Sequence, residues 1–234
     1  MSPKQCYGNP PHGMDPGTLS GALIVIEGSD SSGRSTQVCL LSEWLEQKGY
    51  AVTQTGLTRS QLVGPAITAA KEGNILSPRT MSLFYATDFY DQMENVIVPS
   101  LRAGYIVLAD RYIFTLMARD LVRGANPEWV ESLYSMALVP DAVYFIMASS
   151  RNLVERTLSA HNSLDYWESG MDIGISRDWY ESFVRYQKAL RLEYNNLQKK
   201  YGLEMIDANR SINSVQRILR TRIESVLENL YATV

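Results

Sequence analysis

The pattern of apolar and polar positions along the chain alternates between two types. Short runs that are apolar almost throughout are typical of strands buried on both faces, whereas apolar residues spaced three and four apart are typical of helices. The apolar runs are residues 22–27, 50–55, 105–110, 141–148 and 203–208. The segments with helical spacing include residues 34–48, 77–104, 176–201 and 211–230. This alternation predicts an α/β fold with a five-stranded parallel sheet and helices on both faces.

The first 20 residues fit neither pattern. They are rich in Pro, Gly and Asn, so we expect residues 1–20 to form an irregular arm and residues 21–234 to form a single domain. A chain of 234 residues is long enough to bury the core of such a domain. Within the helical run over 77–104, Pro99 predicts a kink or a break near the end.

Composition and charge argue against several functional classes. A formal net charge of −3 gives no electrostatic reason to expect nucleic-acid binding. No apolar stretch reaches the roughly 18 residues that a membrane span requires, and the first residues lack the features of a signal peptide. The two cysteines and two histidines show neither a disulfide framework nor metal-ligand spacing. We therefore expect a cytoplasmic protein that binds neither nucleic acid nor a membrane.

The clearest motif follows the first apolar run. Residues 28–35 read Gly-Ser-Asp-Ser-Ser-Gly-Arg-Ser and fit the phosphate-loop pattern G-x-x-x-x-G-K-[ST] at every fixed position except Arg34. Glycines permit the tight turn, and successive backbone N–H groups together with the following helix N-terminus attract phosphate. We expect ATP to bind to Gly28, Ser29, Asp30, Ser31, Ser32, Gly33, Arg34, Ser35 and Thr36. The alternative is a glycine-rich turn without a ligand, and Arg34 is its best argument.

Arg34 keeps the positive charge of the missing lysine but changes its shape. A guanidinium is planar and forked, so it cannot occupy the place of a compact ammonium without a shift. Because phosphoryl transfer depends on positioning and electrostatic stabilisation, a displaced charge can still act. We expect a working site with Arg34 among its catalytic residues, rather than a relic.

A second cluster lies where later strands end. Asp110 and Arg111 end the third apolar run, and Arg59 follows the second. We expect Asp110 and Ser35 to hold Mg²⁺, and Arg59 and Arg111 to grip phosphate. The alternatives are a surface ion pair and a surface arginine. Arg119 and Arg123 lie four apart on one helix face, which suits a solvated face as well as an anionic ligand.

These motifs together resemble the thymidylate kinase family, whose P-loop enzymes phosphorylate dTMP to dTDP with ATP and Mg²⁺. The resemblance runs from about residue 22 to about residue 227. It implies the nucleoside monophosphate kinase fold, a nucleoside monophosphate substrate and a homodimer. The segments that carry it read "IEGSDSSGRSTQ", "LSPRTMSLFYATDFYDQ", "GYIVLADRYIFT", "PDAVYFI" and "IDANRSINSV".

The resemblance also implies roles for individual residues. Asp30 would lie near the acceptor sugar, Arg59 and Arg111 would hold the acceptor phosphate, and Tyr85 would stack on the base. A small lid would lie around residues 160–175. Its aromatic residues Tyr166 and Trp167 could cover a ligand, with Gly170 as a hinge, or could belong to the core.

The chain departs from the family pattern beyond Arg34. Phe89 stands where an arginine usually reaches the thymine carbonyl, the lid has Tyr166 in place of its arginine, and Arg119-Asp120 replaces a Tyr-Gln pair. Tyr85 and Phe89 are four apart and share a helix face. We expect both rings to contact the acceptor, and base preference to be relaxed or altered. The hydrogen bond to the thymine carbonyl would be absent or would come from another group, such as Arg119 or Arg123. Phe89 as a core residue is the alternative.

Two other functions stay open at this stage. One is a non-catalytic nucleotide-binding protein built on a kinase fold, and the other is a kinase for a different small acceptor. The presence of Ser35, Arg59, Asp110 and Arg111 together favours a nucleoside monophosphate kinase.

Overall fold

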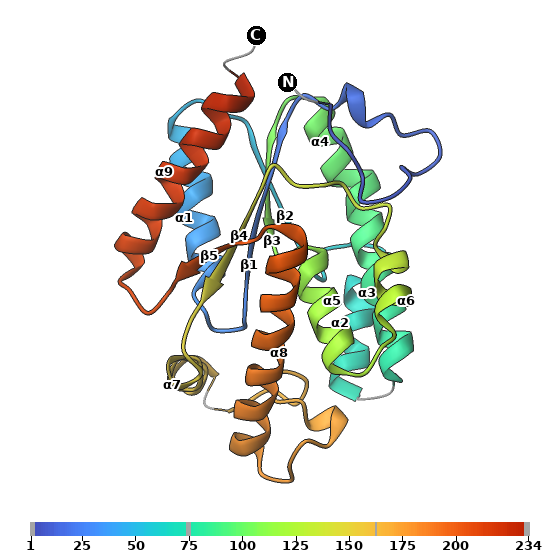
Figure 1. Cartoon of the computed structure of the whole chain (residues 1–234), viewed down its shortest axis with the longest axis vertical. Helices are drawn as coiled ribbons and strands as arrows, with labels where there is room; N and C mark the ends of the chain where they lie inside the picture. Colours follow the sequence, from blue (N-terminus) through green and yellow to red (C-terminus); the bar gives the residue numbers. More distant parts are fainter. Residues whose placement is uncertain (1–2, 74–75, 162, 232–234) are drawn as a thin grey trace.

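The five apolar runs form the strands of one parallel sheet in the computed structural model, which describes residues 3–73, 76–161 and 163–231. This confirms the predicted fold class. The strand order is β2-β3-β1-β4-β5 (Figure 1). The strands are β1 (Ala22–Gly28), β2 (Val52–Gly56), β3 (Ile106–Asp110), β4 (Ala142–Met147) and β5 (Glu204–Asp207).

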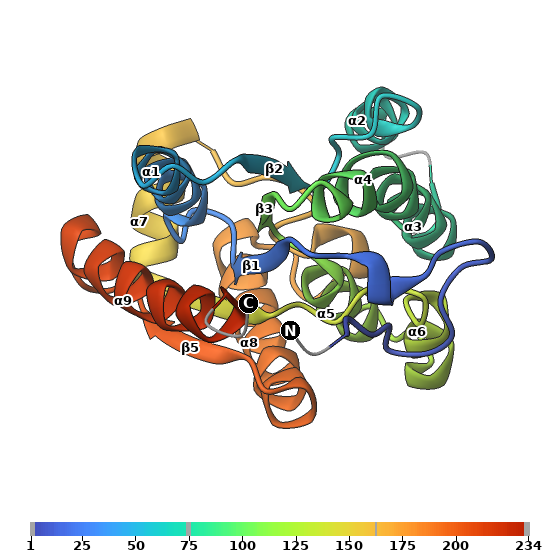
Figure 2. The same cartoon turned by 90° about the horizontal axis from the view of Figure 1, so that it is seen from above.

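Side chains of the central strand β1 alternate between two hydrophobic cores. Leu23 and Val25 pack on one side of the sheet, and Ile24 and Ile26 pack on the other, as expected for a strand buried on both faces. Figure 2 shows the helices on the two sides. One core is covered chiefly by α3 (Pro78–Gln92), α5 (Ile113–Val122), α6 (Pro127–Leu133) and α8 (Trp179–Tyr201), and the other by α1 (Arg34–Gln47), α7 (Ser150–His161) and α9 (Ile212–Tyr231).

The long helical run predicted over 77–104 is interrupted before its proline. After α3 the chain forms a wide π turn over Met93–Ile97 and continues as α4 (Val98–Arg102). Proline has no N–H, and its ring clashes with the carbonyl four residues earlier. A widened turn ahead of Pro99 relieves that clash, which confirms an irregularity near the predicted place.

Several of the shorter helices were not individually predicted, and α2 (Gly64–Gly73) is the one among them that matters most for the site. It packs on α3 through a small apolar cluster of Ile67, Ala70 and Met81. Lys71 of α2 lines the cavity described below, so α2 builds one wall of the site.

The described part of the N-terminal arm, residues 3–20, follows the outside of the domain. It forms a short 3₁₀ turn over Pro16–Thr18 and an isolated bridge between Cys6 and Leu138. Lys4 is paired with Asp141 at 2.5 Å, next to the start of β4. No helix within the described ranges has the length and the apolar character that crossing a membrane requires.

Candidate functional site

The phosphate loop connects β1 to α1 at the carboxyl edge of the sheet. A side chain at Gly28 would bring its Cβ within 2.8 Å of the carbonyl oxygen of Ile146, so the neighbouring strand excludes it. Gly33 has φ +90°, a left-handed conformation that favours glycine. Both glycines of the motif are therefore required by the backbone, and they leave the loop's N–H groups free to form an anion-binding nest.

The side chain of Arg34 is folded back against this loop and is 8% exposed. Its Nη1 donates hydrogen bonds to the carbonyl oxygens of Gly28 (2.6 Å) and Ser29 (3.3 Å), and its Nε donates to Asp110 Oδ1. Asp110 ends β3, which pairs directly with β1. The guanidinium thus bridges the loop and the neighbouring strand.

Ser35 and Asp110 lie together, as the motif predicts. The Ser35 hydroxyl donates to Asp110 Oδ2 at 2.9 Å, and Arg59 Nη2 lies 3.6 Å from the same oxygen. A hydroxyl and a carboxylate are hard oxygen donors that suit Mg²⁺. Across residues 3–73, 76–161 and 163–231, no three His, Cys, Asp or Glu residues cluster as a metal site. A metal here would need further oxygen atoms from a nucleotide.

Asp30 and two arginines form a second ion-pair group beside the loop. Arg111 Nη2 and Arg119 Nη2 each donate to one oxygen of Asp30, the latter at 2.8 Å. Burial, with a smaller contribution from the charge of Arg119, lowers the pKa of Arg111 to about 10, so its guanidinium is still protonated at neutral pH. The structure therefore brings together three of the residues predicted to face the acceptor.

The conformation of Arg111 is held by a residue that sequence reasoning missed. Arg111 has φ +77°, which is unusual for a side chain of this size. Glu27, fully buried at the end of β1, accepts hydrogen bonds from the backbone N–H groups of Tyr112 (2.9 Å) and Thr115 (3.2 Å). Burial raises the pKa of Glu27. Glu27 thereby fixes the start of α5 and the turn that aims Arg111.

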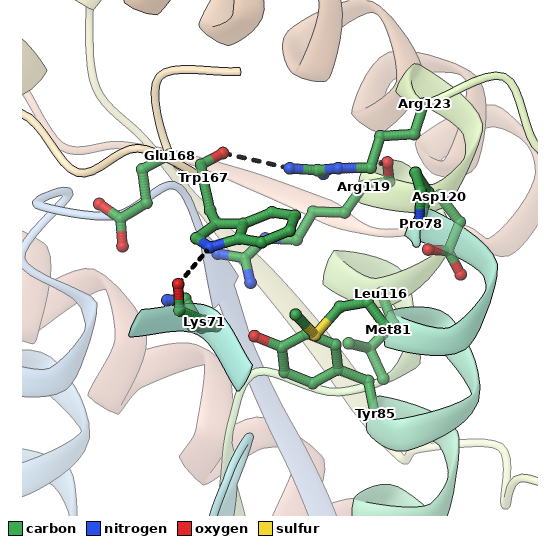
Figure 3. A pocket seen from close by; sticks show the side chains of 10 residues that line it. All are labelled: Lys71, Pro78, Met81, Tyr85, Leu116, Arg119, Asp120, Arg123, Trp167 and Glu168. Atoms are coloured by element: carbon green, nitrogen blue, oxygen red, sulfur yellow. Dashed lines mark hydrogen bonds between the residues drawn. The ribbon is translucent and has the colours of Figure 1, made fainter. Parts of the chain in front are cut away.

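A cavity lined in part by Arg119 lies next to the pair that this arginine forms with Asp30. Tyr85 of α3 lines it as predicted, and Trp167 lies across the cavity from Tyr85 (Figure 3). Two facing aromatic rings suit a planar base. The other lining residues are Lys71, Pro78, Met81, Leu116, Asp120, Arg123 and Glu168.

Trp167 belongs to the predicted lid and is tied to two helices. Its Nε1 donates to the carbonyl oxygen of Lys71 at 3.0 Å, and its own carbonyl accepts from Arg123 at 3.2 Å (Figure 3). Arg123 also binds Asp172 (2.7 and 3.1 Å) and the hydroxyl of Tyr186 (2.6 Å). Arg123 therefore anchors the lid. Residue 162, also in the predicted lid, lies outside the described residues, and the lid's mobility stays a prediction.

Asp120 is a polar residue of the cavity that sequence reasoning did not assign to the site. Its Oδ1 accepts a hydrogen bond from Ser82 at 2.5 Å. Its Oδ2 is buried and has no hydrogen-bond partner in the part of the chain that the structure describes. Burial raises the pKa of this carboxyl to about 6. In the sequence, Asp120 stood out only as a departure from the family pattern.

Phe89 does not occupy the position that we expected. It is 4% exposed and is not among the residues that line the cavity. Its ring packs edge-on against Tyr90, Tyr112 and Tyr134. The helix turns enough between Tyr85 and Phe89 for the first to face the cavity and the second to face the core. The open alternative, that Phe89 is a core residue, is the correct one.

A second cavity lies on the other side of the phosphate loop. Ser32, Gly33 and Thr36 line it, together with Arg156 of α7. Arg156 donates to the carbonyl oxygens of Ser32 (3.1 Å) and Ala208 (3.0 Å). No sequence motif marked Arg156, because its contact depends on how α7 folds over the loop.

Known proteins resemble this chain over most of its length. A model of the thymidylate kinase family matches residues 26–218. The probable thymidylate kinase 2 of Saccharolobus solfataricus is 35% identical over 212 residues, which cover 90% of this chain and 99% of that protein. The probable thymidylate kinase of Thermococcus kodakarensis is 28% identical, covering 88% and 98%. The thymidylate kinase of Caldicellulosiruptor saccharolyticus is 27% identical, covering 90% and 99%.

Proposed function

The chain belongs to the thymidylate kinase family, and we propose that it transfers the γ-phosphoryl group of ATP to dTMP, giving dTDP and ADP. The observation that carries this proposal is the position of the phosphate loop between two cavities. One is lined by Ser32, Gly33 and Thr36, and the other adjoins Asp30 through Arg119. A donor nucleotide and an acceptor nucleotide could therefore meet at the loop.

The transfer needs no nucleophile from the protein. An oxygen of the acceptor phosphate attacks the γ-phosphorus, and the bond from that phosphorus to the β–γ bridging oxygen breaks, so that ADP leaves. The loop's N–H groups would hold the β-phosphate. Ser35 and Asp110 would hold a Mg²⁺ ion, which neutralises phosphate charge when bound.

The arginines would place the acceptor. Arg111 is paired with Asp30 of the phosphate loop, and Arg59 lies near Asp110, which is bonded to Ser35 of the same loop. A phosphate arriving there would accept parallel hydrogen bonds from them. Tyr85 and Trp167 would enclose the base. These contacts position the attacking oxygen, which is the main contribution that a protein makes to phosphoryl transfer.

The test is a direct assay with ATP, Mg²⁺ and each of dTMP, dUMP, dCMP, dAMP and dGMP, with ADP and the nucleoside diphosphate separated by chromatography. We expect the highest kcat/KM with dTMP. Arg111→Met should lower it by about 10²-fold or more, whereas Arg102→Met, an exposed arginine of α4, should leave it unchanged. No turnover with any acceptor, or an unchanged Arg111→Met variant, would reject the proposal and favour a nucleotide-binding protein.

A further inference from the structure

The position of Arg34 has a consequence for metal binding, and the inference rests on the proposed function because its ligand is the nucleotide of that function. We propose that Arg34 is an internal counter-ion of Asp110. In the ligand-free protein its guanidinium keeps a divalent cation away from the carboxylate. Nucleotide phosphates draw the guanidinium away and release Asp110 for the metal.

Both oxygens of Asp110 are engaged by side chains of the chain itself. Oδ1 accepts from Arg34 Nε, and Oδ2 accepts from the Ser35 hydroxyl at 2.9 Å and lies 3.6 Å from Arg59 Nη2. Asp110 is 8% exposed, so its charge is little screened by water. Two arginines around one carboxylate leave no net negative charge to attract a divalent ion.

The neighbouring carboxylate offers no substitute. Asp30 is paired with Arg111 and Arg119, so it too is surrounded by positive charge. Asp110 and Asp30 therefore each have two arginines beside them. This arrangement favours polyanions over free cations, and a nucleotide is the ligand that satisfies it.

The bonds of Arg34 also show how the pair can open. Its Nη1 donates to the neutral carbonyl oxygens of Gly28 and Ser29. A phosphate is charged and therefore binds a guanidinium more strongly than these carbonyl oxygens do. The backbone of Arg34 is already in the first turn of α1. A change of partner from Asp110 to a phosphate therefore requires only rotation of the side chain, and the loop keeps its shape.

The consequence is coupling between two ligands. If phosphates must remove Arg34 before Asp110 can hold a metal, nucleotide and metal each raise the affinity of the other by the same factor. A protein in which Asp110 is free would bind the metal without a nucleotide. The coupling is thus a property of the arginine at position 34, and removal of its guanidinium should weaken it.

The experiment measures binding and needs no turnover. Mn²⁺ is the probe, and its free concentration is read from its electron paramagnetic resonance signal; ADP binding in the presence of EDTA is measured by calorimetry. We expect the unmodified protein to bind ADP without metal and to show negligible binding of Mn²⁺ alone. Arg34→Met should bind Mn²⁺ alone at least about tenfold more tightly and metal-free ADP at least about tenfold more weakly.

The matched control is the double variant Arg34→Met/Asp110→Asn, in which the released carboxylate is gone and the gain in Mn²⁺ affinity should vanish. Equal Mn²⁺ affinity of the unmodified protein and Arg34→Met, or a gain that persists in the double variant, would overturn the proposal. These results are independent of kinase activity. An inactive protein that shows the coupling would reject the proposed function but would still support the counter-ion role of Arg34.

Loss of a buried partner destabilises a protein, so a second variant and a second readout are needed. Arg34→Lys keeps a charge but cannot bond Asp110 and both carbonyl oxygens at once, and it should bind Mn²⁺ alone with intermediate affinity. Mn²⁺ should also raise the thermal midpoint of Arg34→Met or Arg34→Lys more than that of the unmodified protein. An equal rise in all forms would contradict the proposal.

Discussion

Tyr85 and Phe89 are one helical turn apart on α3 and contact different parts of the molecule. Tyr85 lines the cavity proposed to bind the acceptor, whereas Phe89 packs among three tyrosines of the core. Phe89→Leu should therefore lower the free energy of unfolding by about 1–2 kcal/mol and leave the KM for dTMP unchanged. Tyr85→Leu should raise that KM about tenfold or more, because base stacking is lost, with a smaller effect on stability.

Chemical denaturation and steady-state kinetics on both variants check this pair, and each variant is the control for the other. A raised KM in Phe89→Leu at normal stability would place Phe89 at the substrate after all. The same packing argument applies to Phe89→Arg, which would restore the residue that the family pattern usually has at this position. A guanidinium at this buried position should destabilise the fold rather than improve recognition of thymine.

Asp120 should make stability depend on pH. Its pKa of about 6 exceeds the unfolded value of about 3.9, so the folded protein binds the proton more tightly. Its contribution is present at low pH and is lost as the pH rises from about 4 to about 6. The loss amounts to roughly 2–3 kcal/mol. The side chain introduced by Asp120→Asn does not titrate, so this variant should not show the loss of stability.

Urea unfolding of the unmodified protein and Asp120→Asn at a series of pH values measures this difference. The two free energies should diverge as the pH rises towards neutrality, in favour of the variant. Glu228→Gln, which removes an exposed carboxylate on α9, controls for the loss of one charge. Parallel curves for the unmodified protein and Asp120→Asn would show that the carboxyl titrates normally.

The residues that sequence alone could place are those whose partners are fixed by local geometry. Gly28, Ser35 and Asp110 follow from a contiguous loop and from the ends of adjacent parallel strands. Trp167 could only be marked as a lid aromatic, and Asp120 as a departure from a pattern. The orientation of both depends on how α2, α5 and the lid pack together. Phe89 was misplaced because neighbours on a helix face can lie on opposite sides of a packing boundary.

At the scale of elements, the strands were predictable because a parallel sheet buries both faces and leaves a continuous apolar signal. α2 was missed because it is short, begins with Gly64-Pro65 and buries only a small apolar cluster against α3. Pro99 predicted an interruption, but the π turn begins six residues earlier. The proline constrains the preceding turn as well as its own position.

The lid is held by several side chains, and Arg123 makes the largest number of these contacts. Arg123 bonds the carbonyl of Trp167 and both oxygens of Asp172. Arg123→Met should increase amide hydrogen exchange over residues 163–178 and raise the KM for the acceptor about tenfold, because the Trp167 wall of the cavity loosens. Arg151→Ala, which breaks an exposed pair on α7, is the matched control and should change neither.

Addition of acceptor and ADP should slow exchange over the same residues in the unmodified protein. This second measurement tests whether ligands order the lid, separately from the anchoring role of Arg123. Exchange that is unaffected by ligands and by Arg123→Met would show that the segment is held by its other contacts, with α2 and α8. Ser182 and Gln187 of α8 bond the carbonyls of Ser169 and Glu168.

At the scale of the whole molecule, the two faces of the sheet supply different halves of the site. α1 and α7 border the cavity next to Ser32, whereas α2, α3 and α5 border the cavity next to Asp30. Figure 2 shows these helix groups on opposite sides of β1. The central strand thus carries a loop that both halves share. A kinase that transfers a phosphoryl group from one nucleotide to another requires this arrangement, whereas a protein that binds one nucleotide does not.

A ligand that spans the loop should therefore bind far more tightly than either nucleotide. Adenosine and thymidine joined through a chain of phosphates should bind about 10²–10⁴-fold more tightly than ATP or dTMP, because the second contact becomes intramolecular. Calorimetry measures all three affinities. Tyr85→Leu should weaken dTMP and the joined ligand but not ATP, and Arg156→Met should weaken ATP and the joined ligand but not dTMP. A joined ligand that binds no better than ATP would mean that the two cavities are not used at the same time.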